Sequence, residues 1–243
     1  MAEICRYKVA GLDTEFYGCD VTAESTVGKS VCHVFSVAIP TGPLLPRGFN
    51  EATSFVFAGS LLTHPSVRAW LEDPTFKKPV HNQPVDAHTI RNAGVKLRGG
   101  INTLEMARFI YPERAKRRGF GLDALGQDLC GVGKTEDFDD LLGYDGVEYR
   151  NVELTKKRCG CGELGCRKRS GIHLIKIEEQ VWTTQAYKVR KIIPMTELYV
   201  GHRLWERYVA YAAWDAVLAL WVFQIMLRDG LATRAYPWTI AGF

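Results

Sequence analysis

The first half of the chain alternates extended apolar runs with short polar turns. Residues 7–13, 31–39 and 53–58 are rich in β-branched and aromatic side chains and are separated by glycine and proline, which predicts three strands in a meander. A brief buried strand is predicted just before His81, and helices are predicted from Pro65 and over residues 85–92, 103–110, 122–129 and 136–142. Gly94 and Gly131 follow two of these helices, as a left-handed C-terminal cap does.

The pattern changes between residues 144 and 191. This segment is basic, punctuated by glycine and cysteine-bearing, and it lacks the sustained apolar periodicity of its flanks. We therefore predict a main domain formed by residues 1–143 and 192–243, with residues 144–191 inserted into it. Regular order is expected to return at Pro194, and residues 205–227 predict one long apolar helix.

The composition suits one globular domain that carries an insertion. The chain has 243 residues, 47% hydrophobic and 24% charged, and its net charge of +4 is compatible with a polyanionic partner without requiring one. It has no basic head followed by a long apolar stretch, and no apolar run is expected to cross a bilayer. These features predict a cytoplasmic protein without a membrane partner. Seven cysteines, three of them crowded together, favour metal binding over disulfides in a reducing compartment.

Two acidic sites along the chain are candidates for chemistry. Asp13 and Glu15 are two residues apart in an extended run, so both carboxylates leave the same face of a strand, where they are either a solvated surface pair or ligands of a divalent cation. Tyr211 and Asp215 are four residues apart and share one face of the long helix. An aspartate among such apolar neighbours needs a partner, because a buried unpaired carboxylate is costly.

The order and spacing of these residues resemble a known signature. Asp13-x-Glu15, Asn82-x-x-x-Asp86 and Tyr211-x-x-x-Asp215 are similar to the three motifs of the DEDD superfamily of 3′–5′ exonucleases. The tyrosine branch, which includes the proofreading domain of family A DNA polymerases, is the better match, because the histidine branch would place His at Ala210. The resemblance implies an α/β, ribonuclease H-like fold with a mixed central sheet flanked by helices. It covers residues 7–140 and 194–229.

The resemblance also implies a two-metal-ion mechanism. Two Mg²⁺ or Mn²⁺ ions would be held by Asp13, Glu15, Asp86 and Asp215, and Tyr211 would orient the attacking water. The substrate would be a single-stranded or frayed DNA 3′ end, and Asn82 and Phe16 or Tyr17 would contact it, although both aromatic residues could equally be core. A DNA polymerase or another replication protein would be a partner. An exoribonuclease and a catalytically idle nucleic-acid-binding module are the alternatives.

The insertion carries a possible second metal site of its own. Cys159, Cys161, Cys166 and His173 form a Cys-x-Cys-x4-Cys-x6-His array, which predicts one structural Zn²⁺, with free thiols as the alternative. Basic residues bracket the cysteines and predict a contact with the phosphate backbone; they include Arg158, Arg167, Lys168 and Arg169. A basic, zinc-bearing insertion in a compact exonuclease resembles phage-encoded relatives.

Overall fold

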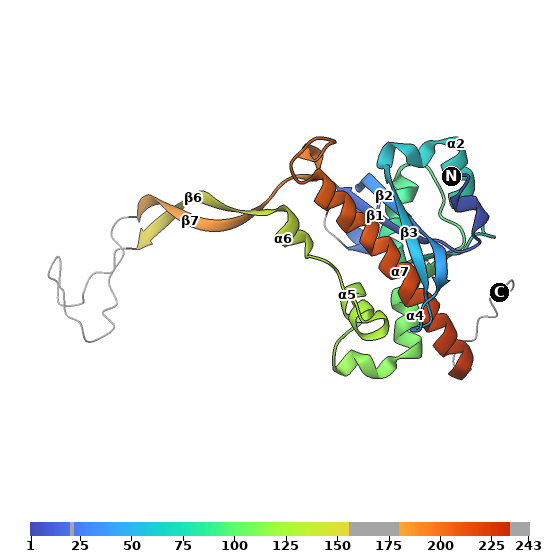
Figure 1. Ribbon diagram of the computed structural model, residues 1–243. Coiled ribbons are helices and arrows are strands. Elements are labelled where there is room, and N and C mark those ends of the chain that lie inside the picture. The colour runs from blue at the N-terminus through green and yellow to red at the C-terminus, as the bar shows by residue number, and fades with distance from the viewer. Residues whose placement is uncertain (20–21, 156–179, 234–243) are drawn as a thin grey trace. The chain divides into compact units, whose positions relative to one another are not determined.

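The computed structural model describes residues 1–19, 22–155 and 180–233, and it divides the chain into two compact units. The first unit comprises Met1–Leu141 and Pro194–Phe243, and the second comprises Leu142–Ile193. Figure 1 shows the elements of both. Each unit is described below by itself.

A mixed sheet forms the centre of the first unit. Strands β1 (Gly11–Tyr17), β2 (Val31–Leu44) and β3 (Asn50–Ala58) pair as the antiparallel meander that the sequence predicts. Strands β4 (Lys78–Val80) and β5 (Gly100–Asn102) pair in parallel. A parallel bridge between Val9 and Lys77 joins the two groups and gives the order β3-β2-β1-β4-β5.

The sheet separates two hydrophobic cores, as the alternation of β2 shows. Phe35, Val37 and Ile39 are buried on one face, where they join the cluster that holds Trp70 of α2 (Pro65–Glu72) and Ile90 of α3 (Gln83–Asn92). Ala38 faces the other core, which contains α4 (Thr103–Ile110), α5 (Leu122–Leu125) and α7 (Trp205–Thr233). Helices therefore cover both faces of the sheet.

The remaining elements of this unit are short. They are α1 (Ala23–Thr26), α6 (Phe138–Leu142), whose last residue belongs to the second unit, the 3₁₀ turns η1 (Ile4–Arg6), η2 (Gly59–Thr63), η3 (Pro112–Lys116) and η5 (Met195–Glu197), and the π-helical turn η4 (Gly126–Cys130). Gly94 and Gly131 have φ values of 78° and 77°, as their predicted capping role requires. The predicted helices are thus present. The bounds of α4 are as predicted, α3 begins two residues earlier, α6 begins two residues later, and α7 ends six residues later. The helix predicted over residues 122–129 is α5 followed by η4.

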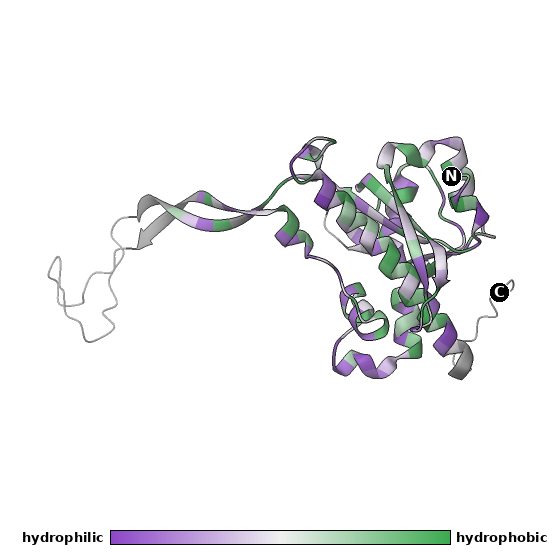
Figure 2. Ribbon diagram, in the orientation of Figure 1, coloured by the Kyte–Doolittle hydropathy of each residue, from purple (hydrophilic) through white to green (hydrophobic). Residues whose placement is uncertain are grey.

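The expectation that no segment could cross a bilayer is wrong on length and composition. Within α7, Trp205–Gly230 has a mean hydropathy of 1.6 in its most apolar window, long and apolar enough to span a membrane. However, 67% of that window is buried inside the fold, and Figure 2 shows the helix packed along the sheet. Burial against protein accounts for its apolar character, as it does for the core helix of many globular domains.

Strand β1 begins and ends later than predicted. Residues 7–10 lie outside it, with only the Val9 bridge, because their neighbours across the sheet are not β2 residues. At its other end β1 extends to Tyr17, since β2 pairs with it as far as Val31, with an irregularity in register after Glu15. Asp13 and Glu15 therefore lie within a paired strand, whose backbone restrains them.

The second unit contains a long two-stranded ribbon, which the sequence did not predict. Strands β6 (Gly143–Thr155) and β7 (Gln180–Ile192) pair antiparallel from Gly143 opposite Ile192 to Thr155 opposite Gln180. Exposed Tyr144, Val147 and Tyr187 supply β-forming side chains without forming a buried core. Cys159, Cys161, Cys166, His173, Arg158, Arg167, Lys168 and Arg169 lie outside the described residues.

Candidate active site

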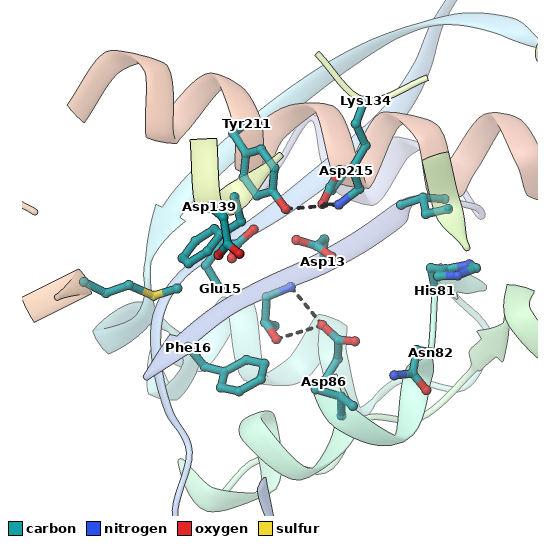
Figure 3. A pocket seen from close by; sticks show the side chains of 15 residues that line it. Asp13, Glu15, Phe16, His81, Asn82, Asp86, Lys134, Asp139, Tyr211 and Asp215 are labelled. Carbon is teal, nitrogen blue, oxygen red and sulfur yellow. Dashed lines mark hydrogen bonds and ion pairs between the residues drawn. The ribbon is translucent and has the colours of Figure 1, made fainter. Parts of the chain in front are cut away.

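One cavity of about 390 Å³ collects the residues of all three sequence motifs. Figure 3 shows side chains from β1, α3 and α7 converging on it. The cavity is lined by Asp13, Thr14, Glu15, Phe16, His81, Asn82, Val85, Asp86, Leu122, Lys134, Phe138, Asp139, Met195, Tyr211 and Asp215. Tyr17 is not among them; its ring lies edge-on to His33 at 6.2 Å between centroids.

Three carboxylates form the centre of this site. One oxygen from each of Asp13, Glu15 and Asp215 can be chosen so that all lie within 4.8 Å of one another. The spacing depends on a close approach of β1 to α7. A Cβ atom on Gly11 would collide with the carbonyl oxygen of Ala216, so only glycine lets the strand pack this tightly beside Asp215.

Asp86 approaches the same cavity from the first turn of α3. Its Oδ1 accepts two hydrogen bonds from Thr14, one from the backbone N–H at 2.8 Å and one from the hydroxyl at 2.7 Å. Asn82 precedes the helix with a φ of 56°, the left-handed conformation that Asn tolerates best among non-glycine residues. This turn directs the start of α3, and hence Asp86, toward β1.

The acidic groups raise one another's pKa values. Burial and then the charge of Asp215 raise the pKa of Glu15 to about 8, and burial is the main reason that the pKa of Asp86 rises to about 7. Burial, followed by the charge of Glu15, raises the pKa of Asp13 well above its ordinary value. Such a cluster is unfavourable when fully ionised, and a cation among the carboxylates would relieve the repulsion.

The donor set fits a divalent metal ion. Carboxylate oxygens are the ligands that Mg²⁺ and Mn²⁺ prefer. Asp215 is 5% exposed, and among the described residues its Oδ1 is a buried oxygen with no hydrogen-bond partner. An unsatisfied buried carboxylate oxygen is costly unless something ligates it. The acidic cluster is thus a candidate centre for divalent metal binding.

Lys134 is the main residue that sequence analysis missed. Its Nζ lies 2.5 Å from Oδ2 of Asp215 and 3.0 Å from the hydroxyl of Tyr211. Burial lowers the pKa of Lys134, but the charges of Asp215 and Tyr211 and the hydrogen bonds to both together outweigh this, and the net shift is upward. A lysine between glycine and acidic residues in an irregular loop resembles any solvated lysine, so no sequence pattern marks it.

His81, which directly precedes the second motif, also lines the cavity. Its Nδ1 lies 3.1 Å from the hydroxyl of Thr103, and burial lowers its pKa to about 4. The imidazole is therefore neutral near pH 7. Asp139, which the sequence did not single out, adds a further carboxyl group at the rim that α6 forms (Figure 3).

Comparison with known proteins agrees with this geometry. No protein-family profile matches the chain. Over 245 residues and 98% of its length, the chain is 27% identical to DNA polymerase I B, chloroplastic/mitochondrial, of Arabidopsis thaliana, and over 51% of its length it is 30% identical to DNA polymerase I B, mitochondrial, of rice, Oryza sativa subsp. japonica. The matches cover 20% and 12% of those relatives, so the chain spans a fifth or less of their length.

The fold has a counterpart among solved structures. The catalytic core of RRP6 from Trypanosoma brucei superposes with a TM-score of 0.52 over 96% of this chain and 44% of that one, at 10% identity. The chain is thus similar in sequence to part of DNA polymerase I proteins and in fold to the catalytic core of RRP6. The mixed α/β architecture confirms the predicted ribonuclease H-like class. Neither the sequence nor the fold comparison bears on a phage origin, which stays a prediction.

Proposed function

We propose that this chain is a metal-dependent 3′–5′ exonuclease of the tyrosine branch, acting on single-stranded or frayed 3′ ends and releasing nucleoside 5′-monophosphates. One observation carries the proposal. Asp13, Glu15, Asp86 and Asp215, which are up to about two hundred positions apart in the sequence, line one cavity together with Tyr211. A purely structural role gives no reason to bury so many acidic groups together, since each raises the cost of ionising the next.

The four carboxylates would hold two Mg²⁺ or Mn²⁺ ions. When bound, such ions activate a water and stabilise the leaving 3′ oxygen of a phosphodiester. The resemblance to the DEDD superfamily implies that all four carboxylates serve as ligands. Asp13 and Glu15 come from β1, Asp215 comes from α7 and Asp86 comes from α3, so three separate elements would hold the ions (Figure 3).

Tyr211 would position the attacking water together with Glu15. Burial is the main cause that raises the pKa of Tyr211 above its ordinary value, so its hydroxyl stays protonated near neutral pH and acts as a hydrogen-bonding group rather than a base. Asn82 and Phe16 line the cavity on the side of α3 and β1, where they could contact the terminal nucleotide by hydrogen bonding and stacking.

DNA is the preferred substrate in this proposal. Sequence similarity to DNA polymerase I proteins extends over nearly the whole chain, and it also supports a role in proofreading, replication or repair with a polymerase as partner. The metal chemistry itself does not distinguish DNA from RNA, because the metal ions act on phosphate oxygens that both polymers have. Only a groove that accepts or rejects the 2′-hydroxyl would decide. The experiment that tests the proposal therefore includes an RNA substrate beside the DNA substrate.

The test compares 5′-labelled single-stranded DNA and RNA of the same sequence in Mg²⁺, Mn²⁺ or EDTA. The expected result is stepwise shortening from the 3′ end of DNA, dependent on metal and abolished in Asp13→Ala. Glu113→Ala is the matched control, since Glu113 is exposed and does not line the cavity. Equal digestion by Asp13→Ala would remove the assignment of the site, and faster digestion of RNA would reassign the substrate.

For the insertion, we propose one structural Zn²⁺ held by Cys159, Cys161, Cys166 and His173, flanked by basic residues that contact the nucleic acid backbone. The support is the ligand set and its spacing in the sequence. Elemental analysis of purified protein should find one zinc per chain, lost in the double variant Cys159→Ser, Cys161→Ser. A folded protein without zinc would contradict this proposal.

A further inference from the structure

Lys134 places a positive charge inside the carboxylate cluster. Its side chain is 21% exposed, and its Nζ contacts Oδ2 of Asp215 at 2.5 Å and the Tyr211 hydroxyl at 3.0 Å (Figure 3). The same ammonium lies 4.9 Å from the centre of the Tyr211 ring. Lys134 thus contacts Asp215, which is a proposed metal ligand, and Tyr211, which is proposed to position the attacking water.

The loop that carries Lys134 is fixed at the peptide group between Gly133 and Lys134. The backbone N–H of Lys134 donates to Oδ1 of Asp123 at 2.7 Å, and Gln127 donates to the other oxygen of Asp123 at 2.8 Å. The indole N–H of Trp214 donates to the carbonyl of Gly133 at 2.8 Å. Because Trp214 precedes Asp215 on α7, the helix that presents the carboxylate also holds the loop that presents the ammonium. The pairing is therefore built into the fold.

The ammonium of Lys134 competes with a bound cation for the carboxylate of Asp215. Lys134 occupies one oxygen of Asp215, while the other has no hydrogen-bond partner among the described residues. An ammonium is a single charge that can partly neutralise the acids when no divalent ion is bound. A divalent ion that draws Asp215 toward Asp13 and Glu15 must offset the loss of this short, largely buried ion pair.

We infer that Lys134 is a built-in counter-ion of the acidic cluster, which a divalent cation must displace from Asp215. The inference rests on the metal site of the proposed function. It predicts that the lysine holds the carboxylates together in the metal-free protein and, in doing so, weakens the binding of metal. Lys134 acts here through Asp215 and Tyr211 and is a positioning residue.

The experiment measures Mn²⁺ binding and thermal unfolding of the full chain, without substrate. Lys134→Met removes the charge at similar volume, and it should bind Mn²⁺ at least about tenfold more tightly than the wild type. In EDTA its Tm should fall, and Mn²⁺ should raise that Tm by more than it raises the wild-type Tm. Lys96→Met is the control, because Lys96 is exposed and changes the net charge equally without lining the cavity.

A second variant keeps the test independent of folding. Lys134→Arg retains the charge and offers a fork that can bind both oxygens of Asp215, so it should bind Mn²⁺ more weakly than the wild type. Mn²⁺ affinity that is unchanged or reduced in Lys134→Met would overturn the inference, as would undiminished affinity in Lys134→Arg. Since nuclease activity is not the readout, a protein that shows these affinities but digests neither DNA nor RNA would contradict the proposed function alone.

Discussion

Thr14 and Asp86 are joined by two hydrogen bonds that end on the same oxygen. The backbone N–H and the hydroxyl of Thr14 both donate to Oδ1 of Asp86, at 2.8 and 2.7 Å, and both residues are buried. They come from β1 and α3, 72 positions apart. Thr14 alternates with Asp13 and Glu15 along the strand, so one short segment supplies two acids to the cluster and anchors a third.

The first prediction concerns the hydroxyl of this pair. Thr14→Val keeps the shape of the side chain and removes one charge-assisted donor, which should lower the free energy of unfolding by about 1–3 kcal/mol. Mn²⁺ binding should weaken, because Asp86 is held less firmly. Thr53→Val is the matched control: it removes the exposed hydrogen bond to Thr41 in the same sheet and should cost less than about 0.5 kcal/mol. Urea unfolding in EDTA measures both, and equal costs would contradict the prediction.

The second prediction is that the metal-free protein loses stability as the pH rises from about 5 to about 8. The pKa of Glu15 is raised to about 8 and that of Asp86 to about 7, so in this window the unfolded chain has released protons that the native state still holds. The stabilisation is complete below the unfolded pKa values and is lost as the pH passes the folded ones. Each such carboxyl contributes a slope of about −1.4 kcal/mol per pH unit.

Saturating Mg²⁺ or Mn²⁺ should flatten this dependence, because a bound cation favours the ionised carboxylates. Urea unfolding at a series of pH values, with EDTA or with metal, provides the measurement. Glu15→Gln is the informative variant, since the pKa of Glu15 is the higher of the two and its removal should reduce the slope in EDTA. A metal-free stability that rises over the same window would show that the cluster does not titrate as described.

Much of the site follows from local periodicity. Side chains that are two residues apart on a strand, or four residues apart on a helix, lie on one face. This spacing alone pairs Asp13 with Glu15 and Tyr211 with Asp215. The convergence of the pairs with Asp86 was predicted only through the resemblance to a family. No local rule brings β1, α3 and α7 to one cavity, since that depends on how the whole unit packs.

Other features depend on contacts that a linear pattern does not contain. The length of β1 is set by its pairing with β2 as far as Val31. Helix α7 is long and apolar enough to span a membrane, and its burial depends on how the fold packs around it. Lys134 reaches Asp215 because Asp123 and Trp214 hold its loop in place. These are tertiary effects, and periodicity cannot predict them.

The third prediction tests the close approach of β1 to α7. Gly11→Ala would place a methyl group against the carbonyl oxygen of Ala216 and the side chain of Leu220, so the helix must move away from the strand. The expected cost is about 1–3 kcal/mol of stability, with a loss of nuclease activity as Asp215 shifts from Asp13. Gly121→Ala is the control, since a Cβ there meets no atom within 4 Å, and it should cost less than about 1 kcal/mol. Equal effects would contradict the packing argument.

The last prediction separates the Tyr211 hydroxyl from the rest of the site. Tyr211→Phe keeps the ring against Phe138 and removes the group proposed to position the attacking water, so activity on single-stranded DNA should fall by about 10²- to 10⁴-fold. Stability should change by only about 1 kcal/mol, because Lys134 loses one acceptor and keeps Asp215. Single-turnover digestion with saturating Mg²⁺ measures the chemical step, and Mn²⁺ titration checks that the carboxylates still bind metal.

Tyr208→Phe is the matched control for Tyr211→Phe. Tyr208 lies one turn earlier on α7 and is fully buried, and its hydroxyl lies 2.9 Å from Nδ1 of His33, outside the cavity. It therefore reports what losing a buried tyrosine hydroxyl does on this helix where that hydroxyl neither lines the cavity nor contacts Lys134. If Tyr208→Phe and Tyr211→Phe lost the same activity, the effect would come from α7 as a whole. A large loss confined to Tyr211→Phe, with metal binding intact, is the outcome that a water-positioning hydroxyl requires.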